Sequence, residues 1–151
     1  MAKVFPASQF PLLKAVLNRL IPAGGNFPGA GDLDLVDHLD RVAASSPAAR
    51  RMFVDGLRQI NLGSERRDAR AFEDLAPAEQ DAVLRNVEGE HRAFFEALVS
   101  HVYQAYYSHP AVIQLLGLEA RPPQPLGHAL PPFDAGITHS MSKRGTLYRQ
   151  A

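Results

Sequence analysis

The stretch FFEALVSHVYQAYYSHPAVIQLLG, residues 94–117, shows the pattern that decides the fold. Its large apolar residues recur every three or four positions, as on one face of a helix, whereas a half-buried strand alternates at every second position. Ser108 and Pro110 predict the start of a further short helix, and Gly117 predicts its end. No segment alternates with period two over any length. The sequence therefore predicts an all-α fold, a compact bundle of five to six helices over residues 1–118.

Capping residues predict where the first helices begin and end. Ser8 is the predicted cap of the first helix, which should end at Pro22. Either Asp32 or Asp34 should cap the second helix, because a side-chain oxygen there can accept a hydrogen bond from a free backbone N–H. That helix is expected to end near Ser45.

The third helix is predicted to begin with Ser46 as its cap and Pro47 in its first turn. Gly63 is predicted to stop it, and the polar run GSERRDAR, residues 63–70, then reads as a solvated connection. A break or kink is expected near Gly89, because glycine weakens a helix by up to about 1 kcal/mol relative to alanine.

Composition excludes several classes of function. The chain has 151 residues, enough for a single core, and its formal net charge is zero, so no general attraction to nucleic acid or an anionic membrane is expected. It has no cysteine, which excludes a disulfide, a thiolate-bound cluster and a thiol nucleophile. No apolar run is long enough to span a membrane. With no leader visible, a cytoplasmic location is expected, or a periplasmic one if a partner carries the chain or a leader was removed.

The densest group of candidate metal ligands is acidic, with one histidine. Its members are Asp32, Asp34, Asp37, His38 and Asp40. Asp34, Asp37 and His38 share a helix face by their spacing, and such a set could bind a hard or borderline metal ion. Acidic residues are also favoured in the first turns of any helix by its dipole. We favour the second interpretation and predict no metal, catalytic or cofactor-binding residue in this chain, because no second ligand motif, nucleophile elbow or phosphate loop accompanies the group.

Tyrosine is concentrated near the end of the predicted bundle. The predicted partner interface includes Tyr103, Tyr106 and Tyr107, because tyrosine packs with its ring and hydrogen-bonds with its hydroxyl. They point to more than one side of one helix, so at least one should face something other than its own bundle. Half-exposed tyrosines in a monomer are an equally good interpretation.

Residues 119–151 are predicted to form an extended, proline-rich arm that packs on a partner subunit. Polyproline-II segments have no internal hydrogen bonds and are extended. The arm also carries large apolar residues that a purely solvated linker does not need. Its predicted interface residues are Pro122, Pro123, Pro125, Phe133 and Tyr148. The alternatives are a disordered terminus or an arm folded over its own bundle.

Three segments in this order resemble one known family. They are LNRLIPAGGNFPGAGDLDLVDHLDRV (residues 17–42), FEDLAPAEQDAVL (residues 72–84) and the stretch at residues 94–117. Together they resemble the gluconate 2-dehydrogenase subunit 3 family, with a match that extends from about Leu12 to Gly117. Its most specific parts are the Ile-Pro before a glycine-rich turn, VDHLD, and an aromatic helix that ends in YYSHP.

The resemblance implies a non-catalytic small subunit. Its partner would be a large FAD-dependent dehydrogenase of the glucose-methanol-choline class that acts on sugars or related alcohols. In that family the FAD and the catalytic histidines belong to the large subunit, and a cytochrome subunit or another acceptor takes the electrons. The small subunit stabilises the large one and, where it has a twin-Arg leader, carries it through export. No such leader is visible here, which favours a role in folding and stability.

Two other kinds of function stay open at the level of sequence. One is a stand-alone metal-dependent hydrolase that uses Asp34, Asp37 and His38. The other is a small helical regulator that binds a peptide or a small ligand.

Overall fold

The computed structural model describes residues 3–118 and residue 143, apart from the side chains at positions 67 and 68. In this part of the chain the fold is all-α, as predicted, with six α-helices, three short 3-10 turns and no β-strand. The elements are η1 (Ala7–Gln9), α1 (Phe10–Leu20), η2 (Ala30–Asp32), α2 (Leu35–Ala44), α3 (Pro47–Asp68), η3 (Phe72–Asp74), α4 (Pro77–Glu90), α5 (Arg92–Tyr107) and α6 (Pro110–Leu115). The predicted arm lies outside the described residues, except for Lys143.

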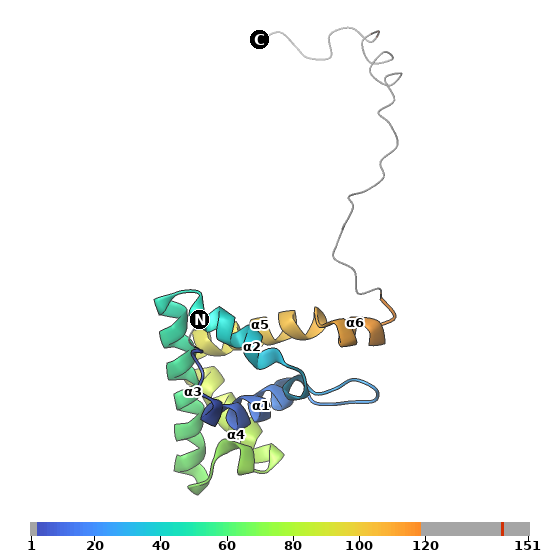
Figure 1. The fold of residues 1–151 in the computed structure, drawn as a ribbon. Coiled ribbons are helices and arrows are strands. Elements are labelled where there is room, and N and C mark those ends of the chain that lie inside the picture. The colour runs from blue at the N-terminus through green and yellow to red at the C-terminus, as the bar shows by residue number, and fades with distance from the viewer. Residues whose placement is uncertain (1–2, 119–142, 144–151) are drawn as a thin grey trace. The chain divides into compact units, whose positions relative to one another are not determined.

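The longest helix, α3, organises the bundle (Figure 1). It runs along one side, and α2, α4 and α5 all pack against it. Helix α1 contacts both α2 and α4. Helices α5 and α6 follow one another in line and lead away from α3. This arrangement leaves the C-terminal half of α5 and all of α6 far from the longest helix.

Apolar side chains from every α-helix form one continuous core. Its largest fully buried members are Phe5, Phe53, Phe72, Leu13, Leu17, Leu39, Leu57, Ile60 and Leu98. Full burial of an apolar side chain of this size stabilises a fold by roughly 1.5–3 kcal/mol. The rings of Phe53 and Phe94 meet edge to face with centroids 5.9 Å apart, an arrangement that aromatic pairs prefer. The helical spacing of Met52, Phe53, Leu57 and Ile60 predicts an inner face for the third helix. Phe53, Leu57 and Ile60 are buried there, and Met52 is partly buried.

A glycine allows α3 and α5 to approach closely at this aromatic pair. A Cβ atom added to Gly56 would lie within van der Waals overlap of the Phe94 ring. Any larger residue at this position would push the ring away from Phe53. The glycine therefore weakens α3 locally but permits the packing that joins two helices of the core.

Helix α3 is longer than the sequence predicts. It begins with Ser46, whose Oγ accepts a hydrogen bond from the Ala49 N–H at 3.0 Å, and this predicted cap is confirmed. The predicted stop at Gly63 is wrong. A Cβ at Gly63 would lie only 3.0 Å from Val83 Cγ1, so this glycine lets α3 pack closely on α4 inside a continuing helix. The helix ends instead before Ala69, which has a left-handed φ of 50°.

The run predicted as a solvated connection is therefore largely helical. Its Ser64 is fully buried, and the hydroxyl group donates a hydrogen bond to the Asn61 carbonyl oxygen at 2.7 Å. A serine can satisfy its hydroxyl within its own helix in this way. The polarity of this run led to the wrong prediction, because the Ser64 hydroxyl group can be buried when it is hydrogen-bonded to a carbonyl oxygen of its own helix.

Other helix boundaries follow the sequence only in part. Ser8 does not cap α1, because it lies inside the preceding turn η1. Asp34 precedes α2 as predicted, but its side chain makes no capping hydrogen bond. The expected break near Gly89 is confirmed two residues later, at His91, which separates α4 from α5 with φ −127° and ψ 48°. His109, rather than Ser108, caps α6 through its Nδ1 atom.

Candidate partner surface

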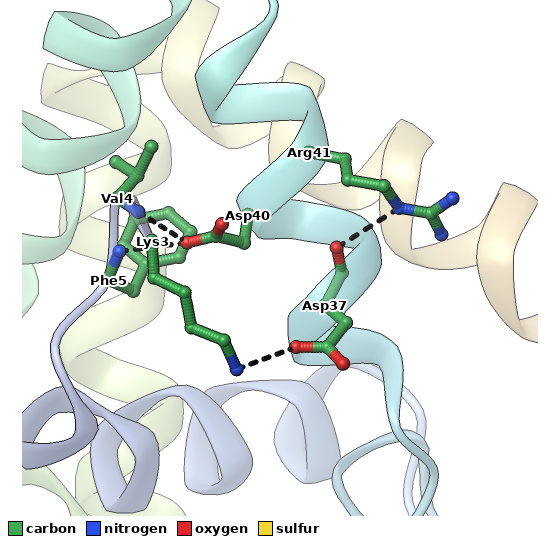
Figure 2. Close-up of polar contacts among 6 residues, drawn as sticks. All are labelled: Lys3, Val4, Phe5, Asp37, Asp40 and Arg41. Atoms are coloured by element: carbon green, nitrogen blue, oxygen red, sulfur yellow. Dashed lines mark hydrogen bonds and ion pairs between the residues drawn. The ribbon is translucent and has the colours of Figure 1, made fainter. Parts of the chain in front are cut away.

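The acidic group around α2 binds groups of its own chain. Asp40 Oδ1 accepts hydrogen bonds from the backbone N–H groups of Val4 and Phe5, at 2.7 and 2.9 Å (Figure 2). The Asp37 carboxylate pairs with Lys3 Nζ at 3.2 Å. These contacts hold the N-terminal segment against α2. The structure thus gives the two carboxylates closest to His38 a structural role.

Asp32 has a partner on a different helix. Its Oδ1 lies 3.1 Å from Lys14 Nζ, and this hydrogen bond lowers the pKa of the Asp32 carboxyl group, with smaller contributions from Asn18 and Gly29. Across the described residues, no three histidine, aspartate or glutamate side chains gather as metal ligands would. Asp34, Asp37 and His38 therefore do not form, among the described residues, the group of metal ligands that the hydrolase alternative requires.

Two histidines that are distant in sequence meet between α2 and α5. The ring centroids of His38 and His101 lie 6.1 Å apart, and the ring of Phe53 on α3 lies 6.3 Å from that of His101. Burial lowers the pKa of His38, and the positive charge of Arg41 and the neighbouring His101 lower it further. No local spacing in the sequence relates residues 38 and 101.

Tyr106 does not fit the predicted interface. It is only 2% exposed, because it faces the core, and its hydroxyl group donates a hydrogen bond to the Pro28 carbonyl oxygen at 2.8 Å. Burial also raises the pKa of this hydroxyl group, with a smaller contribution from Tyr107. Tyr106 thus connects α5 to the loop after α1, and its side chain is not on the surface of the described bundle.

Tyr103 and Tyr107 behave differently, because they are 44% and 51% exposed. They stand one turn apart on the outer face of α5, with ring centroids 5.9 Å apart. The ring of Tyr107 also packs edge to face on Tyr106 at 5.2 Å. The outer pair is therefore exposed and packs, through the ring of Tyr107, on the buried ring of Tyr106.

The exposed apolar surface continues onto and just past α6. Leu115, Leu116 and Leu118 are 43%, 45% and 61% exposed. Together with Tyr103 and Tyr107 they are five of the six large apolar side chains that are exposed in the described part of the chain. We call these five residues the α5–α6 surface.

The sequence marks this surface by an absence of charge, a feature that belongs to no motif. Residues 97–118 include no aspartate, glutamate, lysine or arginine, although such residues make up 21% of the whole chain. Protein interfaces are depleted of charge at their centre and enriched in tyrosine. A helix end without charge on any side is unusual where water is the only neighbour. The remaining predicted interface residues, Pro122, Pro123, Pro125, Phe133 and Tyr148, lie outside the described residues.

None of the described helices combines the length and the apolar character needed to cross a bilayer.

Comparison with known proteins identifies a family. The family model described as Gluconate 2-dehydrogenase subunit 3 matches residues 7–119, which include all six α-helices. The resemblance seen in the three sequence segments is thus confirmed. No curated protein and no solved structure was found to match the chain.

Proposed function

The chain belongs to the gluconate 2-dehydrogenase subunit 3 family, and from this premise we propose that it is the non-catalytic small subunit of a heteromeric dehydrogenase. The partner is a large subunit of the glucose-methanol-choline class that carries FAD and oxidises a sugar or a related alcohol. A cytochrome subunit or another acceptor receives the electrons. This chain supplies stability rather than a redox centre.

The observation that carries the proposal is the α5–α6 surface. It exposes two tyrosines and three leucines within one stretch, residues 97–118, that contains no charged residue. Aromatic anchors surrounded by uncharged side chains are the usual centre of a protein–protein interface. The predicted arm follows Leu118 directly in the sequence.

The mechanism that we propose is mass action on the fold of the partner. A protein that binds only the native state of another stabilises it by an amount that grows with its concentration relative to Kd, about 2.7 kcal/mol at one hundred times Kd. The small subunit would therefore raise the fraction of large subunit that is folded and able to hold FAD.

Co-expression tests this function. The large subunit is produced alone, with this chain, and with a variant of this chain that carries Tyr107→Asp and Leu116→Asp. We expect soluble, flavin-loaded large subunit only with the unchanged chain, measured by flavin absorbance per mole of purified protein. Full flavin loading of the large subunit on its own would refute the role in stability.

A further inference from the structure

A pocket of about 410 Å³ lies between α2, α3 and α5, apart from the α5–α6 surface. Its apolar wall consists of Val42, Met52 and Phe53. Its polar side chains are His38, Arg41, Ser45 and His101. Sites for small molecules commonly have this composition, with a mostly apolar wall and a few polar groups that fix orientation.

The charge of the pocket is positive. Arg41 is the only formally charged residue among those that line it, and no carboxylate lines it. The Nε atom of Arg41 donates to the backbone carbonyl oxygen of Asp37 at 3.3 Å (Figure 2). Its two terminal nitrogens form no hydrogen bond with any residue that the structure describes. They remain able to bind an acceptor, and a planar guanidinium group suits a carboxylate best.

The two imidazole rings each have one nitrogen without a partner. His38 Nε2 and His101 Nδ1 are shielded from solvent and accept or donate no hydrogen bond among the described residues. A buried N–H group without an acceptor is rarer than a buried acceptor without a donor. We therefore place a proton on the other nitrogen of each ring, His38 Nδ1 and His101 Nε2.

The protonation state of His38 agrees with this assignment. Burial lowers its pKa, and the nearby Arg41 and His101 act in the same direction, so the ring is neutral at pH 7. The residues of α3 that face it in the pocket, Met52 and Phe53, are uncharged. The pocket then presents the cationic fork of Arg41 and the two imidazole rings, and no carboxylate lines it.

We propose that this pocket binds a small carboxylate carried on an apolar body. The carboxylate oxygens would accept hydrogen bonds from Arg41, His38 and His101. The apolar body would lie against Val42, Met52 and Phe53. A short linear monocarboxylate satisfies both parts, whereas an inorganic anion satisfies only the first and a neutral alcohol only the second.

The test is a titration of the full chain with hexanoate, followed through the imidazole resonances of His38 and His101 by NMR. Hexanol and acetate serve as probes that each lack one part of the ligand. Arg41→Gln removes the cation, and Arg85→Gln, an exposed arginine on α4, is the matched control. Thermal unfolding of both variants without ligand checks that they are folded.

We expect saturable shifts with hexanoate, weaker binding of acetate and hexanol, and a Kd at least tenfold higher in Arg41→Gln but unchanged in Arg85→Gln. Each of three results would overturn the proposal: no saturable shift, equal affinity for hexanol and hexanoate, or an unchanged Kd in a folded Arg41→Gln protein. An equal loss in both arginine variants would show a general charge effect and would overturn it as well.

Discussion

Two stretches of 22 residues differ in the charge of their outer faces. Residues 47–68 form α3, and residues 97–118 contain most of α5 and all of α6. The first, α3, carries eight charged residues: Arg50, Arg51, Asp55, Arg58, Glu65, Arg66, Arg67 and Asp68. The second carries none. Both have an inner face of fully buried apolar residues, such as Ile60 and Leu98.

The difference teaches how to separate folding from assembly in this chain. The two inner faces obey the same requirement, because each must fill one shared core. Only the outer faces diverge. A charged outer face needs no explanation beyond solubility, whereas an uncharged one with exposed tyrosine and leucine requires another surface to cover it. The comparison therefore points, without reference to the family, to the same surface that we propose for the partner.

The largest effect is expected at the inner face of α5. Leu98→Ala removes a fully buried side chain and leaves a cavity, and we expect a loss of about 2–5 kcal/mol in the free energy of unfolding. Tyr103→Ala, on the outer face of the same helix, should change it by less than about 0.5 kcal/mol. Urea unfolding followed by circular dichroism measures both. Equal losses would mean that the outer face is also part of the core.

The next largest effect concerns assembly. Tyr107→Asp places a charge in the α5–α6 surface, and we expect the affinity for the large subunit to fall by about 2 kcal/mol or more, roughly thirtyfold. The matched control is Val54→Asp, because Val54 is the exposed large apolar residue of α3. Binding of each variant to the immobilised large subunit gives the comparison. If Val54→Asp weakens binding as much, the partner covers the charged stretch instead.

A smaller effect separates two tyrosines of one helix. Tyr106→Phe deletes the hydroxyl group that donates to Pro28, and we expect a loss of about 1 kcal/mol in the free energy of unfolding. Tyr103→Phe removes an exposed hydroxyl group and should leave stability unchanged. The urea midpoints of the two variants decide. If Tyr106→Phe leaves the free energy of unfolding unchanged, water binds the Pro28 carbonyl oxygen in place of the hydroxyl group.

The smallest effect is a dependence of stability on pH. Burial holds the pKa of His38 below its ordinary value of 6.5, so the unfolded chain binds a proton at a higher pH than the folded chain does. Stability is therefore complete above about pH 6.5 and decreases as the pH falls below it. We expect His38→Gln to reduce this slope. The free energy of unfolding measured at about pH 7.5 and about pH 5.5 tests the sign.

The inner faces of the helices were predictable, because three-to-four-residue spacing and burial express the same geometry. The start of α3 at Ser46 and Pro47 was equally visible. Its end was not, because Gly63 is read locally as a stop, while its effect depends on the contact with Val83 of α4. Tertiary packing overrides helix propensity at such a position.

The candidate sites were predictable to a smaller extent. Tyr103 and Tyr107 were identified from residue type alone, but the same argument included Tyr106, which packs inward. Whether a tyrosine on a helix faces in or out depends on the neighbouring helices. The meeting of His38 with His101 depends on how α2 lies against α5, and no pattern within either helix contains that information.

The hydrogen bonds of Asp40 have a consequence for the order of events during synthesis. One carboxylate oxygen holds the backbone N–H groups of Val4 and Phe5, residues made 36 and 35 positions earlier. Chains are synthesised from the N-terminus, so these two residues are made before their acceptor exists. Phe5 belongs to the core and is only 1% exposed in the folded chain. Val4 and Phe5, with the apolar ring of Phe5, therefore lack their contact with Asp40 until α2 has been made.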